Sequence, residues 1–158
     1  ALAIALMYQK KFGKLDFKKF HPAGSLGKKL KTVEDIMLTK NKIPFIDENS
    51  SFEKVLKLIN LKNLGVVIVR NRKKETTGIF TDGDIKRSIQ NKENFKKFKI
   101  KSFMTKKPIS VDKDILAVKA IGIMNEKKIT SLCVHSKINK KKTIGIIHIH
   151  NLISMNSF

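Results

Sequence analysis

The sequence predicts an α/β chain of the α+β kind, with two similar lobes that each run strand, helix, strand, strand, helix. The first observation is a repeat: Gly78 begins a Gly-Ile-Phe stretch, and Gly145 begins Gly-Ile-Ile 67 residues later. The second is the continuous apolar run Val66–Val69, whose length and β-branching are typical of a buried strand. The third is the small number of elements in each lobe, which cannot cover both faces of a sheet. Each lobe is therefore expected to pack on its twin.

Other landmarks repeat at nearly the same distance. The matched pairs are Met37 with Met104 at 67 residues, and Ile46–Asp47 with Val111–Asp112 and Val66–Val69 with Ser131–Val134 at 65. Small insertions and deletions therefore balance out between the copies. A period this long exceeds those of small solenoid repeats, so each copy is predicted to be a compact lobe. We divide the chain into a segment 1–30 and two pseudo-twofold-related lobes, 31–92 and 93–158.

The first 30 residues differ from both lobes. Apolar spacing over Ala1–Lys11 predicts a helix without a capping residue, which we expect to be the end of a longer helix in a larger protein. The stretch His21–Leu30 contains a proline, two glycines and a serine, and predicts a structured turn followed by a short helix capped by Ser25. From the residues alone, His21 is either a turn or packing residue or a catalytic one.

The elements of the first lobe follow from capping residues, apolar periodicity and β-branched runs. Thr32 and Ser51 are placed to cap two helices, and the second helix is amphipathic. In chain order, the expected elements are a helix at Thr32–Met37, a strand at Ile43–Ile46, a helix after Ser51, strands at Val66–Val69 and Thr76–Phe80, and a helix at Ile85–Gln90.

The second lobe repeats this plan after a lysine-rich connector. Asp114 is expected to cap its amphipathic helix, and Gly122 within that helix to mark close packing between the lobes. In chain order, the expected elements are a strand at Pro108–Val111, a helix from Asp114 to Glu126, strands at Leu132–Val134 and Thr143–Ile147, and a last helix from Asn151.

The strand-to-helix turn at Thr81 is the most informative stretch for function. Thr81 can cap the new helix through its hydroxyl, Asp84 three residues later can bond back to the backbone, and Gly83 allows close approach of another group. A helix start of this kind suits a phosphate, and a nearby carboxylate suits a ribose diol. The simpler interpretation is a capping box without a ligand.

Composition restricts the class of protein. The chain has 158 residues, 41% of them hydrophobic, which is enough to bury a core in one or two small lobes. The single cysteine, Cys133, lies in an apolar run and is expected to be a buried strand residue, with no disulfide within the chain and no metal cluster. No run of about 18 apolar residues is present and the start lacks the basic stretch of a signal peptide, so we expect a cytoplasmic protein without a membrane partner.

The net charge of +21 raises the question of nucleic-acid binding. Only three of the 34 basic residues are arginine, and the lysines are spread over every segment without an aromatic platform among them. The codons of an A-rich genome explain this enrichment as well as a function does. We therefore expect no specific nucleic-acid partner, although weak adhesion at low salt fits the charge.

The duplicated plan with the motif Gly78–Asp84 resembles a tandem pair of CBS domains, the nucleotide-sensing modules appended to many enzymes and channels. Four stretches in the same order are more specifically similar to the C-terminal half of D-arabinose 5-phosphate isomerases. They are His21–Leu30, Ile79–Asp84, Lys128–Leu132 and Ile147–His150. The resemblance covers nearly the whole chain.

That isomerase family interconverts ribulose 5-phosphate and arabinose 5-phosphate on the way to the octulosonate sugar of lipopolysaccharide or of some capsules. The resemblance implies that residues 1–30 end a sugar-isomerase (SIS) domain. It also implies that His21, which matches the histidine of the family's H-P-G-G motif, reaches the active site as a proton-transfer group. Ala23 replaces the usual glycine of that motif. Because most of such a site would lie upstream, this chain alone is not expected to turn over a sugar phosphate, and no cofactor is implied.

For the regulatory half, the resemblance implies a site for a nucleotide or nucleotide-sugar effector. Thr81 and Asp84 match the positions that hold phosphate and ribose hydroxyl groups in nucleotide-binding CBS domains. The other residues implied in effector binding are Ile43, Pro44, Asp82, Thr130, His148 and Asn151. The second lobe departs from the general pattern, with His148 where Thr or Ser is common and Asn151 in place of a carboxylate, and an amide accepts a hydrogen bond less strongly than a carboxylate.

Further expectations concern a metal ion, partner chains and an alternative function. His148 and His150 lack a third ligand, so we expect no metal, and the resemblance implies a homo-oligomer. The alternative to a part of an isomerase is a free-standing CBS pair that senses adenine nucleotides. The His21 motif speaks against this alternative, because a bare sensor has no use for that segment.

Overall fold

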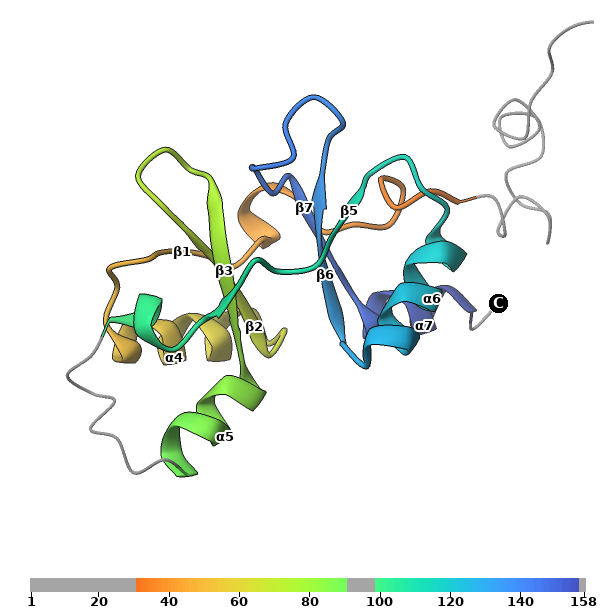
Figure 1. Ribbon diagram of the computed structural model, residues 1–158. Helices are drawn as coiled ribbons and strands as arrows, with labels where there is room; N and C mark the ends of the chain where they lie inside the picture. The colour runs from red at the N-terminus through yellow and green to blue at the C-terminus, as the bar shows by residue number, and fades with distance from the viewer. Residues whose placement is uncertain (1–30, 91–98, 157–158) are drawn as a thin grey trace, which may run out of the picture.

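The computed structural model of the chain describes residues 31–90 and 99–156. Within these ranges two lobes stand side by side, each with a small sheet and helices (Figure 1). The hairpin loops of both lobes project at one end, and the helix that follows the last strand of each hairpin lies at the other end (Figure 1). The expected two-lobed α/β fold is confirmed. The expectations for His21 and for the helix of a sugar-isomerase domain lie outside the described residues.

The sheet of the first lobe has four strands in the order β1-β2-β3-β4. Their bounds are Phe45–Asp47 for β1, Val66–Arg70 for β2, Thr76–Thr81 for β3 and Thr105–Lys106 for β4. β1 is parallel to β2, whereas β3 is antiparallel to both β2 and β4. Since β4 comes from the second repeat, that repeat supplies an edge strand to the first sheet.

The sheet of the second lobe repeats the first three strands. It has the order β5-β6-β7, with β5 at Ser110–Asp112, β6 at Ser131–His135 and β7 at Gly145–His148. β5 is parallel to β6, and β6 forms an antiparallel hairpin with β7. This is the same connection as in β1 to β3, so the duplication predicted from the sequence is confirmed in the described residues.

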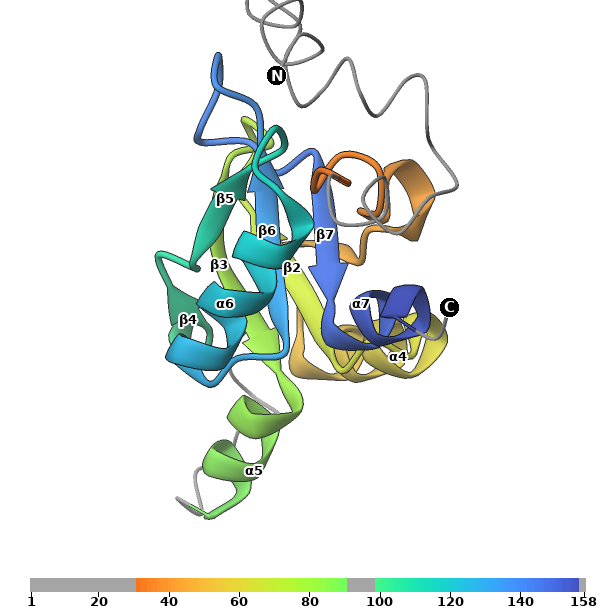
Figure 2. The same cartoon turned by 90° about the vertical axis from the view of Figure 1, so that its right-hand side faces the viewer.

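Helices complete both lobes. The α-helices are α4 (Phe52–Lys62), α5 (Asp82–Gln90), α6 (Ala117–Lys127) and α7 (Ile149–Asn156), and the 3₁₀ helices are η1 (Lys40–Lys42) and η3 (Ile100–Ser102). Ser51 caps α4 as expected, because its hydroxyl accepts the backbone N–H of Lys54 at 3.4 Å. Figure 2 shows α5 extending beyond the end of the sheets.

The expected helix at the start of the first repeat is wrong. Residues 32–37 form a turn, in which the carboxylate of Asp35 accepts both the backbone N–H and the hydroxyl of Thr32, at 2.7 and 2.8 Å. Thr81 and Asp84 pair in the same way at the start of α5, so this pairing does not by itself prevent a helix. Here the turn ends because the backbone N–H of Leu38 donates to the carbonyl of Ile146 in β7, at 2.9 Å.

The expectations for Asp114 and Gly122 are also wrong. Helix α6 starts only at Ala117, after Leu116 as its N-cap, and Asp114 instead pairs with Lys137 at 3.2 Å. A Cβ atom built on Gly122 meets nothing within 4 Å, so this glycine faces open space and does not mark a contact between the lobes.

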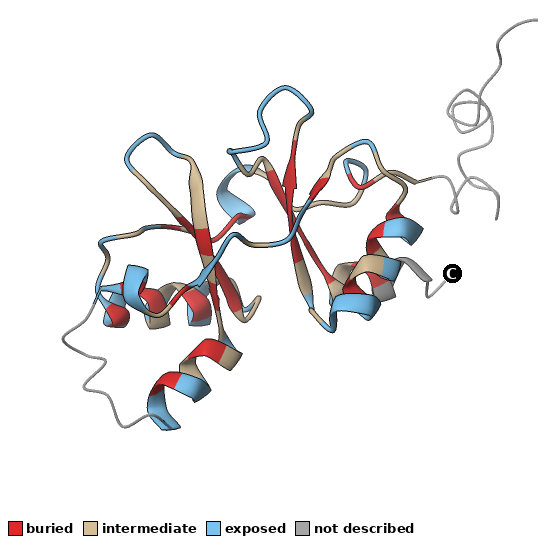
Figure 3. Cartoon of the chain, in the orientation of Figure 1, coloured by how far each residue is buried: buried red, intermediate tan, exposed pale blue. Residues whose placement is uncertain are grey.

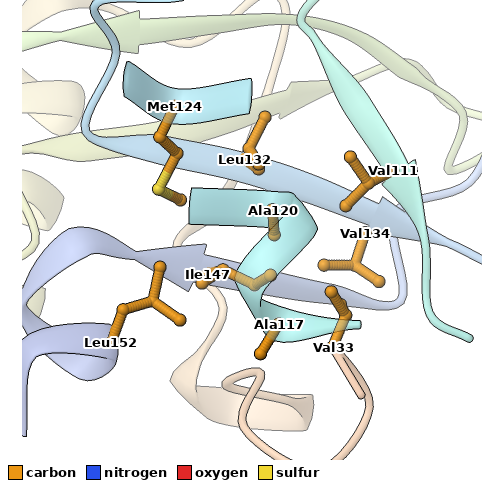
Figure 4. Packing of buried hydrophobic residues seen from close by; sticks show 9 residues of the cluster. All are labelled: Val33, Val111, Ala117, Ala120, Met124, Leu132, Val134, Ile147 and Leu152. Carbon is orange, nitrogen blue, oxygen red and sulfur yellow. The ribbon is translucent and has the colours of Figure 1, made fainter. Parts of the chain in front are cut away.

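The start of each repeat packs into the core of the other lobe. Val33, from the first repeat, is fully buried in the second lobe (Figure 4). Conversely, Ile100 and Met104, from the second repeat, are buried in the first lobe with Phe52 and Phe80. The two repeats thus exchange segments, so the core of each lobe is complete only when both repeats are folded.

A third cluster fills the space between the lobes. Its buried members are Ile43, Val66, Ile68, Cys133 and Ile146. Figure 3 shows the buried strands at the centre of the molecule and the exposed hairpin loops above them. Cys133 is buried as predicted, and this burial raises the pKa of its thiol to about 11, so the thiol stays protonated at neutral pH.

Candidate functional site

A cavity of about 690 Å³ opens between the lobes, at the end of the sheets opposite the hairpin loops. Both lobes line it, and so does the segment that leads from β4 to β5. The lining residues are Asn63, Leu64, Gly65, Ile79, Thr81, Asp82, Gly83 and Arg87 of the first repeat, and Thr105, Lys107, Pro108, Ile109, Lys128, Ile129, Thr130, Ser131, His148 and His150 of the second.

The capping box predicted at the start of α5 is present. The carboxylate of Asp84 accepts the backbone N–H and the hydroxyl of Thr81, both at 2.8 Å, and the N–H of Asp84 bonds to the Thr81 hydroxyl oxygen at 3.4 Å. Asp84 is 4% exposed and also accepts hydrogen bonds from Arg87 and from the hydroxyl of Thr105. The carboxylate therefore holds α5, β3 and β4 together behind the cavity wall, while Thr81 stands at the wall itself.

Gly65 brings the main chain close to the first turn of α5. It has a φ of +63°, and a Cβ built on it would lie 2.7 Å from Oδ2 of Asp82. The backbone N–H of Asp82 donates to the carbonyl of Gly65 at 3.1 Å. A side chain at position 65 would be strained by the positive φ and would displace the Asp82 carboxylate from the cavity wall.

Cationic side chains surround the cavity. Arg87, Lys107 and Lys128 are all exposed and line it, and Asp82 brings one carboxylate to the same wall. The first N–H groups of α5 add the positive end of a helix dipole near Thr81. The site is therefore electrostatically suited to a ligand with more negative than positive charge.

Two histidines form the far wall. The rings of His148 and His150 lie 5.0 Å apart, and Nδ1 of His148 accepts the backbone N–H of His150 at 3.3 Å. This bond requires an unprotonated Nδ1. Burial and, to a lesser degree, the neighbouring His150 lower the pKa of His148, so its ring is neutral at pH 7.

The structure brings together four of the residues implied in effector binding. Thr81, Asp82, Thr130 and His148 line the cavity. Asp84 lies behind Thr81, as described above. The remaining three, Ile43, Pro44 and Asn151, are outside the lining.

Several lining residues were not among those expected. The most informative are Pro108 and Ile109, because they take, in the second repeat, the place before the first strand that Ile43 and Pro44 take in the first. The 65-residue offset of the repeat relates the two pairs. Applying the repeat together with the exchange of segments would have pointed to them.

Neither a metal site nor a membrane span is found among the described residues. Across 31–90 and 99–156, no group of three or more His, Cys, Asp or Glu side chains is placed to hold a metal ion. Over the same residues, no helix has the length and apolarity needed to cross a membrane.

Comparison with known protein families identifies the family of this chain. The CBS domain matches residues 33–91 and 100–156, which are the two repeats. The chain belongs to the CBS-domain family. Its two lobes form a CBS pair, and the resemblance expected from the sequence is confirmed.

Full-length relatives of this CBS pair include arabinose 5-phosphate isomerases. The isomerase KdsD of Salmonella typhi is 36% identical over 154 residues, which cover 97% of this chain and 46% of that protein. KdsD of Yersinia pestis is 35% identical over the same shares. An uncharacterised protein of Rickettsia prowazekii (strain Madrid E) is 34% identical over 98% of this chain and 47% of its own length. The chain thus spans slightly less than half the length of these relatives.

Solved structures share the fold of the CBS pair. CBSX2 in complex with AMP superposes with a TM-score of 0.68 at 21% identity, covering 80% of this chain and 96% of that one. The CBS domain pair of the protein MJ0100, in complex with 5′-methylthioadenosine and S-adenosyl-L-methionine, gives 0.71 at 20% identity, covering 81% and 97%.

Proposed function

We propose that this CBS pair binds an anionic nucleotide or nucleotide-sugar in the cavity between its lobes and thereby regulates an arabinose 5-phosphate isomerase. The observation that carries the proposal is the cavity itself, with a volume of about 690 Å³ and a wall built around the capped start of α5. Its volume lies within the range of about 300–1,000 Å³ that small-molecule sites occupy.

The wall offers a separate environment to each part of a nucleotide. Thr81 and the positive end of the α5 dipole suit a phosphate, and the cations beside them add charge. The carboxylate of Asp82 suits ribose hydroxyl groups. Ile79, Ile109 and Ile129 supply apolar surface for a base. This division of polar and apolar groups favours a nucleotide over a simple anion.

The solved relatives suggest which probes to use first. CBSX2 holds AMP, and the MJ0100 pair holds 5′-methylthioadenosine and S-adenosyl-L-methionine. These ligands share an adenosine moiety, so adenine nucleotides are the first candidates here, with nucleotide-sugars as the second class.

The isomerase part of the proposal is supported by the identity to KdsD over nearly the whole chain. In this proposal residues 1–30 end a sugar-isomerase domain and His21 transfers protons during the aldose–ketose shift of the sugar phosphate. The lobes 31–92 and 93–158 then transmit effector binding to that domain. The isomerase would serve octulosonate and lipopolysaccharide synthesis as a cytoplasmic homo-oligomer, since its sugar phosphates and nucleotides are cytoplasmic metabolites.

The alternative, a free-standing sensor of adenine nucleotides, uses the same cavity. It is favoured by the likeness of the fold to CBSX2, a chain of which the CBS pair covers 96%. The two functions differ in one respect only, which is whether a longer protein containing this CBS pair interconverts ribulose 5-phosphate and arabinose 5-phosphate.

Calorimetric titration of the 158-residue chain with AMP, ATP, S-adenosylmethionine and UDP-glucose tests the binding. We expect at least one to bind with a dissociation constant in the micromolar range, and Thr81→Val to weaken it at least tenfold. Thr77→Val, on the same strand but outside the cavity lining, is the control and should leave binding unchanged. Equal affinity in wild type and Thr81→Val would contradict the assignment of the site.

A further inference from the structure

The two halves of this CBS pair differ where the chain enters the first strand of each lobe. In the second repeat, Lys107 leads directly into Pro108 and then β5. In the first repeat, Lys40 is followed by two additional residues, Asn41 and Lys42, before Ile43 and β1. Lys40 and Lys107 have nearly the same backbone conformation, with φ values of 53° and 51°, and this places the insertion directly after Lys40.

We call residues 38–44 the first entry segment and residues 105–109 the second, and the insertion gives the first one a short helix that is tied to α4. Residues Lys40–Lys42 form the 3₁₀ helix η1, and Nζ of Lys62 at the end of α4 donates to the carbonyl of Asn41. The counterpart of Lys62 in the second repeat is Lys127, which instead pairs with Glu126 at 2.8 Å. The second entry segment therefore lacks this tether among the described contacts.

The first entry segment is also more deeply buried than the second. Ile43 is 5% exposed and belongs to the cluster between the lobes, and Pro44 is buried beside it. Their counterparts are more open: Ile109 is 40% exposed, and Pro108 is half-buried at the edge of the cavity. The backbone bond that anchors each segment also differs, since Ile68 N–H donates to Pro44 O at 2.8 Å and Cys133 N–H to Ile109 O at 3.3 Å.

Each entry segment flanks one of the two strand-to-helix turns. The segment that contains Thr105 pairs with Ile79, two residues before Thr81. The segment that contains Leu38 pairs in the same way with Ile146, two residues before His148. The open segment therefore lies beside Thr81 and its capping box, and the closed segment lies beside His148.

We infer that the CBS pair is asymmetric and takes one ligand per chain, on the side that Thr81 shares with Lys107–Ile109. The pseudo-equivalent side, between His148 and Ile43–Pro44, is filled by the protein's own side chains and held shut by η1. This inference rests on the proposed function, because it assumes that the cavity binds a nucleotide.

A matched pair of charge reversals tests the inference. Lys107→Glu and Lys40→Glu change the same residue type at equivalent backbone positions, both side chains are exposed, and both substitutions alter the net charge equally. The full chain is titrated by calorimetry with AMP, or with whichever of the four nucleotides named above binds most tightly. We expect one site per chain in the wild type, about tenfold weaker binding in Lys107→Glu and unchanged binding in Lys40→Glu.

The outcomes separate this inference from the proposed function. Two sites per chain, or weaker binding in Lys40→Glu rather than Lys107→Glu, would overturn the asymmetry while leaving nucleotide binding intact. Equal losses in both variants would also overturn it, because they would reflect net charge alone. If none of the four nucleotides binds the wild type, the proposed function fails and the asymmetry with it.

Discussion

The hydroxyl oxygens of Thr76 and Thr143 lie 2.7 Å apart, within hydrogen-bonding distance, although 67 residues separate them. That separation is also the distance between Gly78 and Gly145, so the two threonines occupy equivalent positions in the two repeats. A direct contact between equivalent residues lies on the axis that relates them. Thr76 and Thr143 therefore mark the pseudo-twofold axis at the base of the hairpin loops.

This contact predicts an unequal effect of two similar substitutions. Thr76 Oγ1 also accepts the backbone N–H of Thr143 at 3.2 Å, so Thr76→Val removes two hydrogen bonds, whereas Thr143→Val removes the shared one and a weak bond with the Cys133 thiol. We expect losses in the free energy of unfolding of about 1–2 kcal/mol for Thr76→Val and about 1 kcal/mol or less for Thr143→Val. Urea unfolding of both single variants and the double variant measures them. Strictly additive losses would show that the two hydroxyls do not interact.

The glycines two residues further along each repeat make a second pair of equivalent contacts. A Cβ built on Gly145 would lie 2.3 Å from Sδ of Met37, and one built on Gly78 would lie 2.6 Å from Sδ of Met104 and 2.8 Å from the backbone oxygen of Thr105. Either Gly→Ala substitution should cost about 1–3 kcal/mol of stability through overpacking.

A compensating substitution should relieve the overpacking more fully at Gly145 than at Gly78. Shortening Met37 to Ala removes the obstructing side chain, so Met37→Ala should cost less in a Gly145→Ala background than in the wild type. Met104→Ala should bring less relief to Gly78→Ala, because the carbonyl of Thr105 remains in place. Double-mutant cycles from thermal unfolding test this. Equal relief at both sites would contradict the described backbone contact.

Asp84 is predicted to contribute strongly to stability. Asp84→Ala removes the half of the capping box that bonds back to Thr81, together with the hydrogen bond from Thr105, and leaves the backbone N–H of Thr81 without this acceptor, which should cost about 2–4 kcal/mol. Asp82→Ala, two residues earlier and exposed, should change stability by less than about 0.5 kcal/mol. Thermal melts of the two variants decide the matter. Similar melting temperatures for both would show that the Asp84 carboxylate is not structural.

The lowered pKa of His148 predicts a pH-dependent stability. The folded chain binds a proton at this ring less readily than the unfolded chain, whose histidine has an ordinary pKa of about 6.5. The contribution of neutral His148 is therefore fully present above about pH 6.5 and is lost as the pH falls from there through the folded-state pKa. We expect His148→Asn to flatten the decrease in melting temperature between about pH 7.5 and 5.5. Exposed His150→Asn should keep most of that decrease, and an unchanged decrease in His148→Asn would refute the assignment.

Much of the fold could be predicted because local signals determine it. The strand Val66–Val69 and the cap Ser51 each depend on residues that are close in the sequence, and the glycine repeat shows that the second lobe follows the same plan. The structure confirms all three. Thr32 and Asp114 were misjudged as caps because a polar residue before an apolar run also suits a turn or an ion pair. The Asp114 carboxylate pairs with Lys137, and the turn that begins at Thr32 ends where Leu38 pairs with Ile146.

The exchange of segments could not be predicted from patterns. Val33 and Ile100 are apolar residues of the kind that any core accepts, and periodicity does not tell which lobe will bury them. For the same reason Ile43 and Pro44 were expected at the effector site, although the cavity is lined by Pro108 and Ile109. The insertion after Lys40 was visible in the sequence as a change of offset from 67 to 65, but its effect depends on tertiary contacts.

A crystal structure of the 158-residue chain grown with the tightest-binding nucleotide tests the central claim most directly. The account predicts a single nucleotide per chain between the lobes, with its phosphate at Thr81 and the first turn of α5 and its base against Ile109. A nucleotide bound elsewhere on the chain, or an empty cavity at a concentration that saturates binding in solution, would contradict it.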